Sequence, residues 1–355
     1  MESENESYSQ EPSKKFPKVA IIGAGPSGLM SARHIKEVAE ITVFESKSDL
    51  GGLWLYSDIS ERNHPNIESD EYYKLYGYLH DSIYYDLICN LPQQFMMFKD
   101  FPHDEKNTQY LLSRGAFQKY LNDYSDHFDI RNWIKFNTTV TNLKVNEESE
   151  NRYKLSYVSY NNPDEDPIHH NESYDYVIIA NGHFSTPNEP VFEGKETFTG
   201  SQFHIHNFRK FDDKDFKGKN VLLVGARYSA TDLINHMFFY GTKDRINPNQ
   251  VFITSRDAST LSKSEMYSEL ISEGSLKVKS GNIVKIDQDT VHFGDGSEEK
   301  IDTILYATGY YYSMPFIDPK DGIIEWDNLS ESKLIEESEI ENDCRKGLYF
   351  GPLYK

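Results

Sequence analysis

A glycine-rich loop near the start of the chain places the strongest constraint on its fold. The hexapeptide at residues 23–28 has the spacing GxGxxG, follows the apolar run 18–22 and opens a helical pattern at 27–39. In such units the first glycine permits a tight turn, the second lets the backbone approach a pyrophosphate, and the third packs the helix on the strand. Amide groups at the helix start then bind phosphate. The residues expected at this nucleotide site are Gly23, Gly25, Pro26, Ser27 and Gly28.

The next predicted strand, 41–45, ends on an acidic residue, Glu45. Dinucleotide-binding units carry an acid about 20 residues beyond the glycine loop, where it accepts hydrogen bonds from ribose hydroxyls. A carboxylate at this place repels a 2′-phosphate, so the unit favours FAD or NAD over NADP. Because strand–helix–strand units form parallel sheets, the sequence predicts an α/β fold.

Two adjacent glycines follow, in the sequence Gly51-Gly52-Leu53-Trp54. Glycines allow the chain to lie close against a flat ligand, and Trp54 would pack beside it. A surface turn followed by a buried tryptophan explains the same residues equally well. Both interpretations stay open at this point.

A second strand–turn–helix pattern begins at 220–224, and its helical stretch runs over 229–240. Gly225 keeps the first glycine, while Arg227 stands at the second place and Ala230 at the third. The following strand, 251–255, leads to Arg256 rather than to an acid. Arginines bind phosphate directly, so this unit favours NADP(H), although a solvated arginine is the simpler alternative.

Two such units far apart predict two Rossmann-like dinucleotide-binding domains, one inserted into the other. We expect an FAD-binding domain at 16–210 and 305–355, an NADPH-binding domain at 211–304, and a disordered tail at 1–15. Residues 111–128 have a helical pattern, and the polar stretch 161–172 is predicted to be a hairpin tip or a loop.

Composition excludes several other classes of protein. The chain has 37 basic and 57 acidic residues and a formal net charge of -20, which disfavours binding to nucleic acid. Two distant cysteines, Cys89 and Cys344, argue against a disulfide scaffold, a zinc site or a dithiol reductase. No apolar run is long enough to span a membrane, and no signal peptide is evident, so a cytoplasmic protein is expected.

The segment 198–208 reads FTGSQFHIHNF, which fits FxGxxxHxxxF. With it, the sequence resembles the flavin-containing monooxygenase family, the class B flavoprotein monooxygenases, which carry this motif. The related Baeyer–Villiger enzymes usually end the motif in Trp, so Phe208 favours the branch that oxygenates nitrogen and sulfur. His204 lacks companion metal ligands, so we expect no metal and assign it to ordering the linker. The segments 182–187 and 307–310 and the second glycine turn also match, most closely the bacterial trimethylamine monooxygenase type.

The resemblance implies an enzyme that uses FAD, NADPH and O2 to oxygenate a small tertiary amine or sulfide through a C4a-hydroperoxyflavin. It implies that Asn90 acts as the catalytic hydrogen-bond donor at the flavin and that Tyr228 lies beside the nicotinamide. Further FAD-site positions by resemblance are Lys47, Gly52, Leu53, Trp54, His80 and Val140. For the NADPH site and the linker they are Gly225, Arg227, Ser229, Arg256, Thr308 and Gly309.

Family members usually continue well beyond the position that matches Lys355. Two alternatives follow from this difference in length: a truncated and uncoupled NADPH oxidase, and a non-catalytic remnant of the family. A Baeyer–Villiger type oxygenase stays open as a third alternative. Family members also lead us to expect a homodimer.

Overall fold

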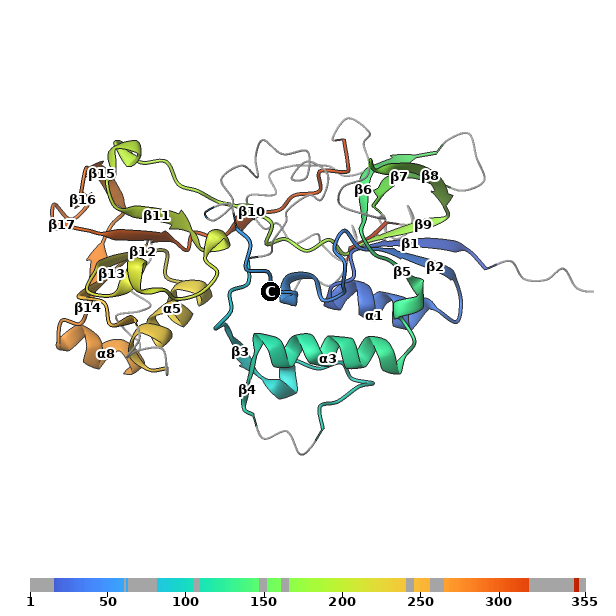
Figure 1. The fold of residues 1–355 in the computed structure, drawn as a ribbon, viewed down its shortest axis with the longest axis horizontal. Coiled ribbons are helices and arrows are strands. Elements are labelled where there is room, and N and C mark those ends of the chain that lie inside the picture. Colours follow the sequence, from blue (N-terminus) through green and yellow to red (C-terminus); the bar gives the residue numbers. More distant parts are fainter. Residues whose placement is uncertain are drawn as a thin grey trace, which may run out of the picture.

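The computed structural model describes residues 16–60, 62, 82–104, 109–146, 152–160, 166–240, 246–255, 265–318 and 348–350. The predicted tail at 1–15 and two predicted site residues, His80 and Arg256, lie outside these ranges. The described part forms two lobes, each built on a parallel sheet (Figure 1).

The first lobe is centred on a five-stranded parallel sheet. Its order is β20 (Leu348–Phe350), β9 (Tyr176–Ile179), β1 (Lys18–Ile22), β2 (Glu40–Phe44) and β5 (Ile134–Lys135). Helix α1 (Pro26–Ile35) connects β1 to β2, as the glycine loop predicts. Strand β1 is apolar from Val19 to Ile22 and is buried over the same residues, because a central parallel strand is covered on both faces.

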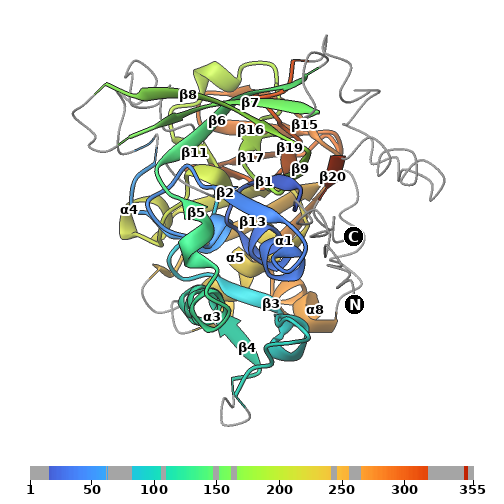
Figure 2. The same ribbon diagram turned by 90° about the vertical axis from the view of Figure 1, so that its right-hand side faces the viewer.

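The side chains of β1 alternate between two cores. Val19 and Ile21 pack with α1 and with α3 (Arg114–His127), while Ala20 and Ile22 pack under an antiparallel sheet on the opposite face. That sheet consists of β6 (Thr138–Val145), β7 (Tyr153–Ser159) and β8 (Ile168–Tyr174). Figure 2 shows the same order of layers from the side.

The second lobe repeats this plan. Its parallel sheet has the order β11 (Ser201–His204), β18 (Thr303–Tyr306), β12 (Asn220–Val224), β13 (Gln250–Ser255) and β14 (Leu276–Ser280). Val221 and Leu223 of β12 pack toward α5 (Tyr228–Phe238), and Leu222 and Val224 toward a small antiparallel sheet. That sheet consists of β15 (Ile283–Asp287), β16 (Thr290–Phe293) and β17 (Glu298–Lys300). Helix α8 (Glu265–Ser272) precedes β14 in this lobe.

Strand pairing sets the limits of this second unit. The predicted limits of 211 and 304 leave β11 outside it, whereas β11 pairs with β18 in the second sheet. The two connections between the lobes also pair with each other, because β10 (Thr186–Pro187) and β19 (Tyr310–Tyr311) form an antiparallel ladder. The second unit is therefore an insertion whose entry and exit lie side by side.

Two local predictions are wrong. Residues 111–113 form strand β4 (Leu111–Ser113) on β3 (Ile88–Pro92), and the helix begins only at Arg114, where the Ser113 hydroxyl accepts a hydrogen bond from the Ala116 amide. The stretch 161–172, predicted to be a hairpin tip or a loop, was drawn too long, because residues 168–172 belong to β8, which pairs antiparallel with β7 along its whole length. This edge strand exposes polar side chains, so its hydropathy resembles that of a loop.

Short elements complete the described part: η1 (Gly52–Trp54), η3 (Gln93–Phe95), η4 (Arg131–Trp133), η5 (Lys195–Thr197), η6 (Ile205–Asn207) and α4 (Asp213–Phe216). Within the described ranges, no helix combines the length and the hydropathy that crossing a bilayer requires.

Candidate dinucleotide sites

The first glycine loop has the geometry that its sequence predicts. Gly23 has φ +103°, and a Cβ atom added there would lie 2.5 Å from the Ala180 carbonyl oxygen. A Cβ at Gly28 would lie 1.9 Å from the Gly23 carbonyl oxygen, so the third glycine permits the close turn of α1. Gly25 is the N-cap of α1, Pro26 and Ser27 open the helix, and no side chain caps this end. The first-turn amide groups are therefore available to an anion.

Glu45 follows β2 directly and is 5% exposed. One carboxylate oxygen accepts a hydrogen bond from the Ala24 amide (2.8 Å), and the other accepts from the Lys47 amide (3.0 Å). Glu45 thus holds the glycine loop. The Ser46 hydroxyl also donates to the oxygen that accepts from Lys47 (3.4 Å), and a carboxylate accepts about four hydrogen bonds, so capacity for a further donor remains.

The turn at Gly51 and Gly52 lies against the glycine loop. Both residues have positive φ, +123° and +54°, and a Cβ on Gly52 would lie 2.9 Å from the Gly25 Cα atom. Leu53 and Trp54 follow in η1, and the Trp54 ring packs edge-on against Phe117 at 4.5 Å between centroids. The turn that was expected to lie against a flat ligand is therefore in contact with the loop that was expected to approach a pyrophosphate.

The second glycine turn repeats the first. Gly225 has φ +113°, and a Cβ there would lie 2.3 Å from the Ala307 carbonyl oxygen, as Gly23 faces Ala180. Arg227 is the N-cap of α5, and no acidic residue lies in the first turn of that helix. Tyr228 is 75% exposed, Ser229 is half-buried, and Ala230 is fully buried at the third glycine place. This helix end is favourable for an anion.

Thr308 and Gly309 lie in the returning linker, directly after the carbonyl that faces Gly225. The Thr308 hydroxyl donates to the Asn188 carbonyl (2.5 Å), and Gly309 has φ +85°. His204 is fully buried beside this linker, with its ring 5.1 Å from that of Tyr310, and burial lowers its pKa to about 4. No group of three His, Cys, Asp or Glu residues in the described ranges could hold a metal ion.

The remaining predicted positions are less closely tied to the glycine loop. Asn90 lies on β3 with its side chain exposed, between the buried Cys89 and the exposed Leu91. Val140 is 8% exposed and packs in the core under β6–β8, so its side chain serves packing.

Comparison with known proteins agrees with this geometry. The family model for flavin-binding monooxygenase-like proteins matches residues 16–266 and 256–336. The chain belongs to the flavin-binding monooxygenase-like family.

Individual family relatives point the same way. The chain is 33% identical to a trimethylamine monooxygenase of Methylocella silvestris over 313 residues, which is 84% of this chain and 62% of the relative. Its fold resembles the crystal structure of Tmm from a Pelagibacter strain, with TM-score 0.69, 30% identity, and coverage of 85% and 63% of the two chains. It also resembles S-allyl-L-cysteine S-oxygenase of Allium sativum, with TM-score 0.70, 25% identity, and coverage of 88% and 66%. The chain thus spans less than two thirds of the trimethylamine monooxygenase relative.

Two basic residues of this flavin-binding monooxygenase-like chain, Lys47 and Arg209, have buried side-chain nitrogen atoms. Burial lowers the pKa of Lys47 to about 8, Glu45 opposes this shift, and Arg209 adds to it. Arg209 is only 7% exposed and directly follows the FxGxxxHxxxF motif. Sequence reasoning missed Arg209, and its place at the end of the motif was the available signal. Lys47 thus feels both the carboxylate of Glu45 and the guanidinium of Arg209.

A buried carboxyl group joins the two lobes of this family fold. Tyr84, which precedes β3, donates a hydrogen bond to Asp232 of α5, and the His236 imidazole lies 3.8 Å from the same carboxylate. Burial raises the pKa of Asp232 to about 7, the Tyr84 hydrogen bond lowers it, and Asp86 raises it further. Because its pKa is raised from 3.8 to about 7, the Asp232 carboxyl keeps its proton in the folded protein in the pH range between these values, where the unfolded chain releases it.

We expect Asp232→Asn to make the protein about 1–3 kcal/mol more stable than the wild type at pH 8 and nearly equal to it at pH 4. The folded pKa is raised from 3.8 to about 7, so this group's contribution to wild-type stability falls as pH rises through that window. An asparagine oxygen still accepts from Tyr84 without a charge to bury. Urea unfolding at several pH values measures the difference, with Asp123→Asn on the exposed face of α3 as control. Parallel pH profiles for wild type and Asp232→Asn would contradict the prediction.

Proposed function

We propose that the chain binds FAD at the first glycine loop and NADPH at the second, and oxygenates a small tertiary amine or sulfide. The observation that carries this proposal is the repeated turn, in which Gly23 and Gly225 each face the carbonyl that ends a neighbouring parallel strand. Glu45 follows the second strand of the first unit, and Arg227 caps the helix of the second unit. A carboxylate suits ribose hydroxyls, and a guanidinium suits phosphate.

The residues beside Glu45 fit a flavin nucleotide. Gly25 and Gly52 meet through backbone without side chains, and a Cβ on Gly52 would lie 2.9 Å from the Gly25 Cα atom. The charge of Lys47 interacts with those of Glu45 and Arg209, and positive charge suits a pyrophosphate. When bound, the flavin supplies the redox chemistry that activates O2.

The overall reaction that we propose balances with NADPH as the source of two electrons. The amine or sulfide gains one oxygen atom on its lone pair. The other oxygen atom leaves as water, which takes up the two electrons and one hydrogen from NADPH and one proton from solvent, and NADP⁺ is the oxidised product. The protein's own residues bind, orient and exclude water in such a reaction. Support for the substrate class comes from the relatives, which are named for trimethylamine and for S-allyl-L-cysteine.

The test begins with purification in the presence of FAD and a visible absorption spectrum. NADPH is then added in air, and its consumption is followed with and without trimethylamine and a small sulfide. Bound flavin with formation of N-oxide or S-oxide is the expected result. Lactone or ester formation from a ketone would identify a Baeyer–Villiger oxygenase instead, and peroxide alone an uncoupled NADPH oxidase. A protein that binds no flavin would contradict the proposal.

Within this proposal, Asn90 is the residue that donates a hydrogen bond near the reacting oxygen. We expect Asn90→Leu to lower the yield of oxygenated product per NADPH by at least about tenfold, because a donor at the developing charge is lost. The missing electrons should appear as hydrogen peroxide, while the Kd for FAD stays unchanged. Asn171→Leu, at an exposed asparagine of β8, serves as control. Unchanged product yield in Asn90→Leu would remove Asn90 from the site.

A further inference from the structure

We propose that Gln118 and Arg131 are positioning residues for the flavin nucleotide, because they hold the Gly51–Gly52 turn against the first glycine loop. The inference rests on the proposed function in one respect, namely that this loop binds FAD. It concerns residues of α3 and η4 that carry none of the glycine motifs.

The turn needs support from outside itself. Gly51 and Gly52 both have positive φ, and glycine loses more backbone entropy on ordering than any other residue. The Gly51 amide donates to the Ala24 carbonyl (3.0 Å), which links the turn to the first glycine loop. Any movement of this turn would therefore change the contact between Gly52 and Gly25, which belongs to the loop proposed to bind the dinucleotide.

Gln118 of α3 contacts the residues of the turn directly. Its amide nitrogen donates to the Leu50 carbonyl (2.8 Å), and a Cβ on Gly51 would lie 2.1 Å from its amide oxygen. That oxygen is buried and makes no hydrogen bond within the described ranges. A buried acceptor without a partner lowers stability. Packing alone therefore does not explain why residue 118 is a glutamine. The hydrogen bond from its amide nitrogen to the Leu50 carbonyl does explain it.

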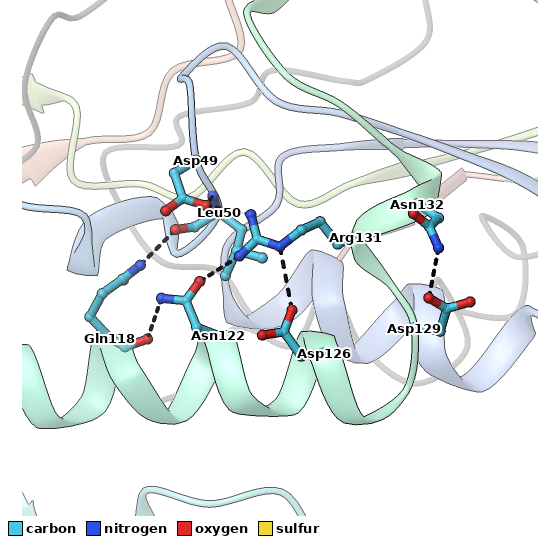
Figure 3. Close-up of polar contacts among 8 residues, drawn as sticks. All are labelled: Asp49, Leu50, Gln118, Asn122, Asp126, Asp129, Arg131 and Asn132. Carbon is cyan, nitrogen blue, oxygen red and sulfur yellow. Dashed lines mark hydrogen bonds and ion pairs between the residues drawn. The ribbon is translucent and has the colours of Figure 1, made fainter.

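Arg131 closes the support into a ring (Figure 3). One terminal nitrogen of its guanidinium contacts Asp49 (2.9 Å), and the other donates to the Asn122 side chain (2.8 Å). Asn122 donates in turn to the Gln118 backbone carbonyl (3.1 Å), and Asp49 accepts from the Leu50 amide (2.8 Å). We call Asp49, Gln118, Asn122 and Arg131 the turn-support network. Only a forked side chain at 131 can hold Asp49 and Asn122 together.

The test compares Gln118→Leu, Arg131→Gln and Arg131→Lys with a matched control. Lys119→Gln is that control, because it removes an ion pair with Asp123 from the exposed face of the same helix. The Kd for FAD is measured by fluorescence titration of the full chain, and amide hydrogen exchange of residues 50–54 is followed without nucleotide. The Kd for NADP⁺ shows whether an effect stays within the first lobe.

We expect Arg131→Gln to weaken FAD binding by about fivefold, the most that a partly exposed ion pair usually contributes. Gln118→Leu should weaken it more, and Arg131→Lys should be intermediate. Exchange of residues 50–54 should be faster in Gln118→Leu and Arg131→Gln. The Kd for NADP⁺ and all properties of Lys119→Gln should match the wild type.

The possible failures are separable. Unchanged exchange at residues 50–54 would overturn the inference whether or not flavin binds. Unchanged FAD affinity in variants of a flavin-binding wild type would also overturn it, and would leave the proposed function intact. Equal losses of FAD and NADP⁺ affinity would mean general destabilisation and would overturn it too. A wild type that binds no flavin would instead contradict the proposed function, and the inference with it.

Discussion

Gly28→Ala should destabilise the protein by about 3 kcal/mol or more and abolish flavin binding, the largest effect that we expect from a single methyl group. The added carbon would lie 1.9 Å from the Gly23 carbonyl oxygen, which is backbone and cannot rotate away. Gly23 is itself held, because its amide donates to the Phe44 carbonyl (2.8 Å). To relieve the clash, α1 must move away from β1 and take with it the helix end that would face the phosphates.

The control for this substitution is Gly115→Ala in α3. A Cβ at Gly115 meets no atom within 4 Å, so the same change should stabilise the protein by up to about 1 kcal/mol through helix propensity. Urea unfolding and FAD titration of both variants measure the contrast. Similar changes in the two variants would show that the close turn of α1 is not what constrains Gly28.

Phe208→Ala should cost about 3–5 kcal/mol of stability, the usual range for removing a buried aromatic ring. Phe208 is 1% exposed and ends the FxGxxxHxxxF motif. Its ring lies 4.9 Å from that of Phe211 and 5.1 Å from that of Tyr84, measured between centroids. Because Tyr84 also bonds to Asp232, the cavity should loosen the contact between the lobes as well as the core.

Phe95→Ala provides the comparison, since Phe95 is 75% exposed and its loss should change stability by no more than about 0.5 kcal/mol. Thermal and urea unfolding of both variants would decide the matter. A small effect of Phe208→Ala would mean that the motif's last aromatic residue is not needed for packing.

The sequence predicted those elements whose signal is local. Both glycine turns and the strands before them were found, because the residues that build a dinucleotide-binding turn are adjacent in sequence and each has a distinct physical task. The family predicted from the 198–208 motif is confirmed by the family model. Because members of a family share a fold, the motif that indicated the family also predicted the fold.

What could not be predicted depends on contacts between distant residues. Tyr84 meets Asp232 across 148 positions, and neither residue lies in a motif. The sequence did not predict that the side-chain nitrogen atoms of Lys47 and Arg209 are buried, because charged residues are normally assigned to the surface. Strand β8 was missed since pairing with β7, and not hydropathy, makes it a strand. The roles of Asn90 and of the other FAD- and NADPH-site residues stay predictions.

The ladder between β10 and β19 has a consequence for how such a protein can change over evolution. Thr186 pairs with Tyr311, so the chain leaves the first lobe and returns to it at neighbouring positions. An insertion with adjoining ends imposes no strain on its host, and the entropy of closing a loop grows only slowly with its length. The second lobe can therefore lengthen, shorten or be exchanged for another module while the host sheet keeps its register. Changes in the second lobe can thus accumulate largely independently of changes in the sheet of the first lobe.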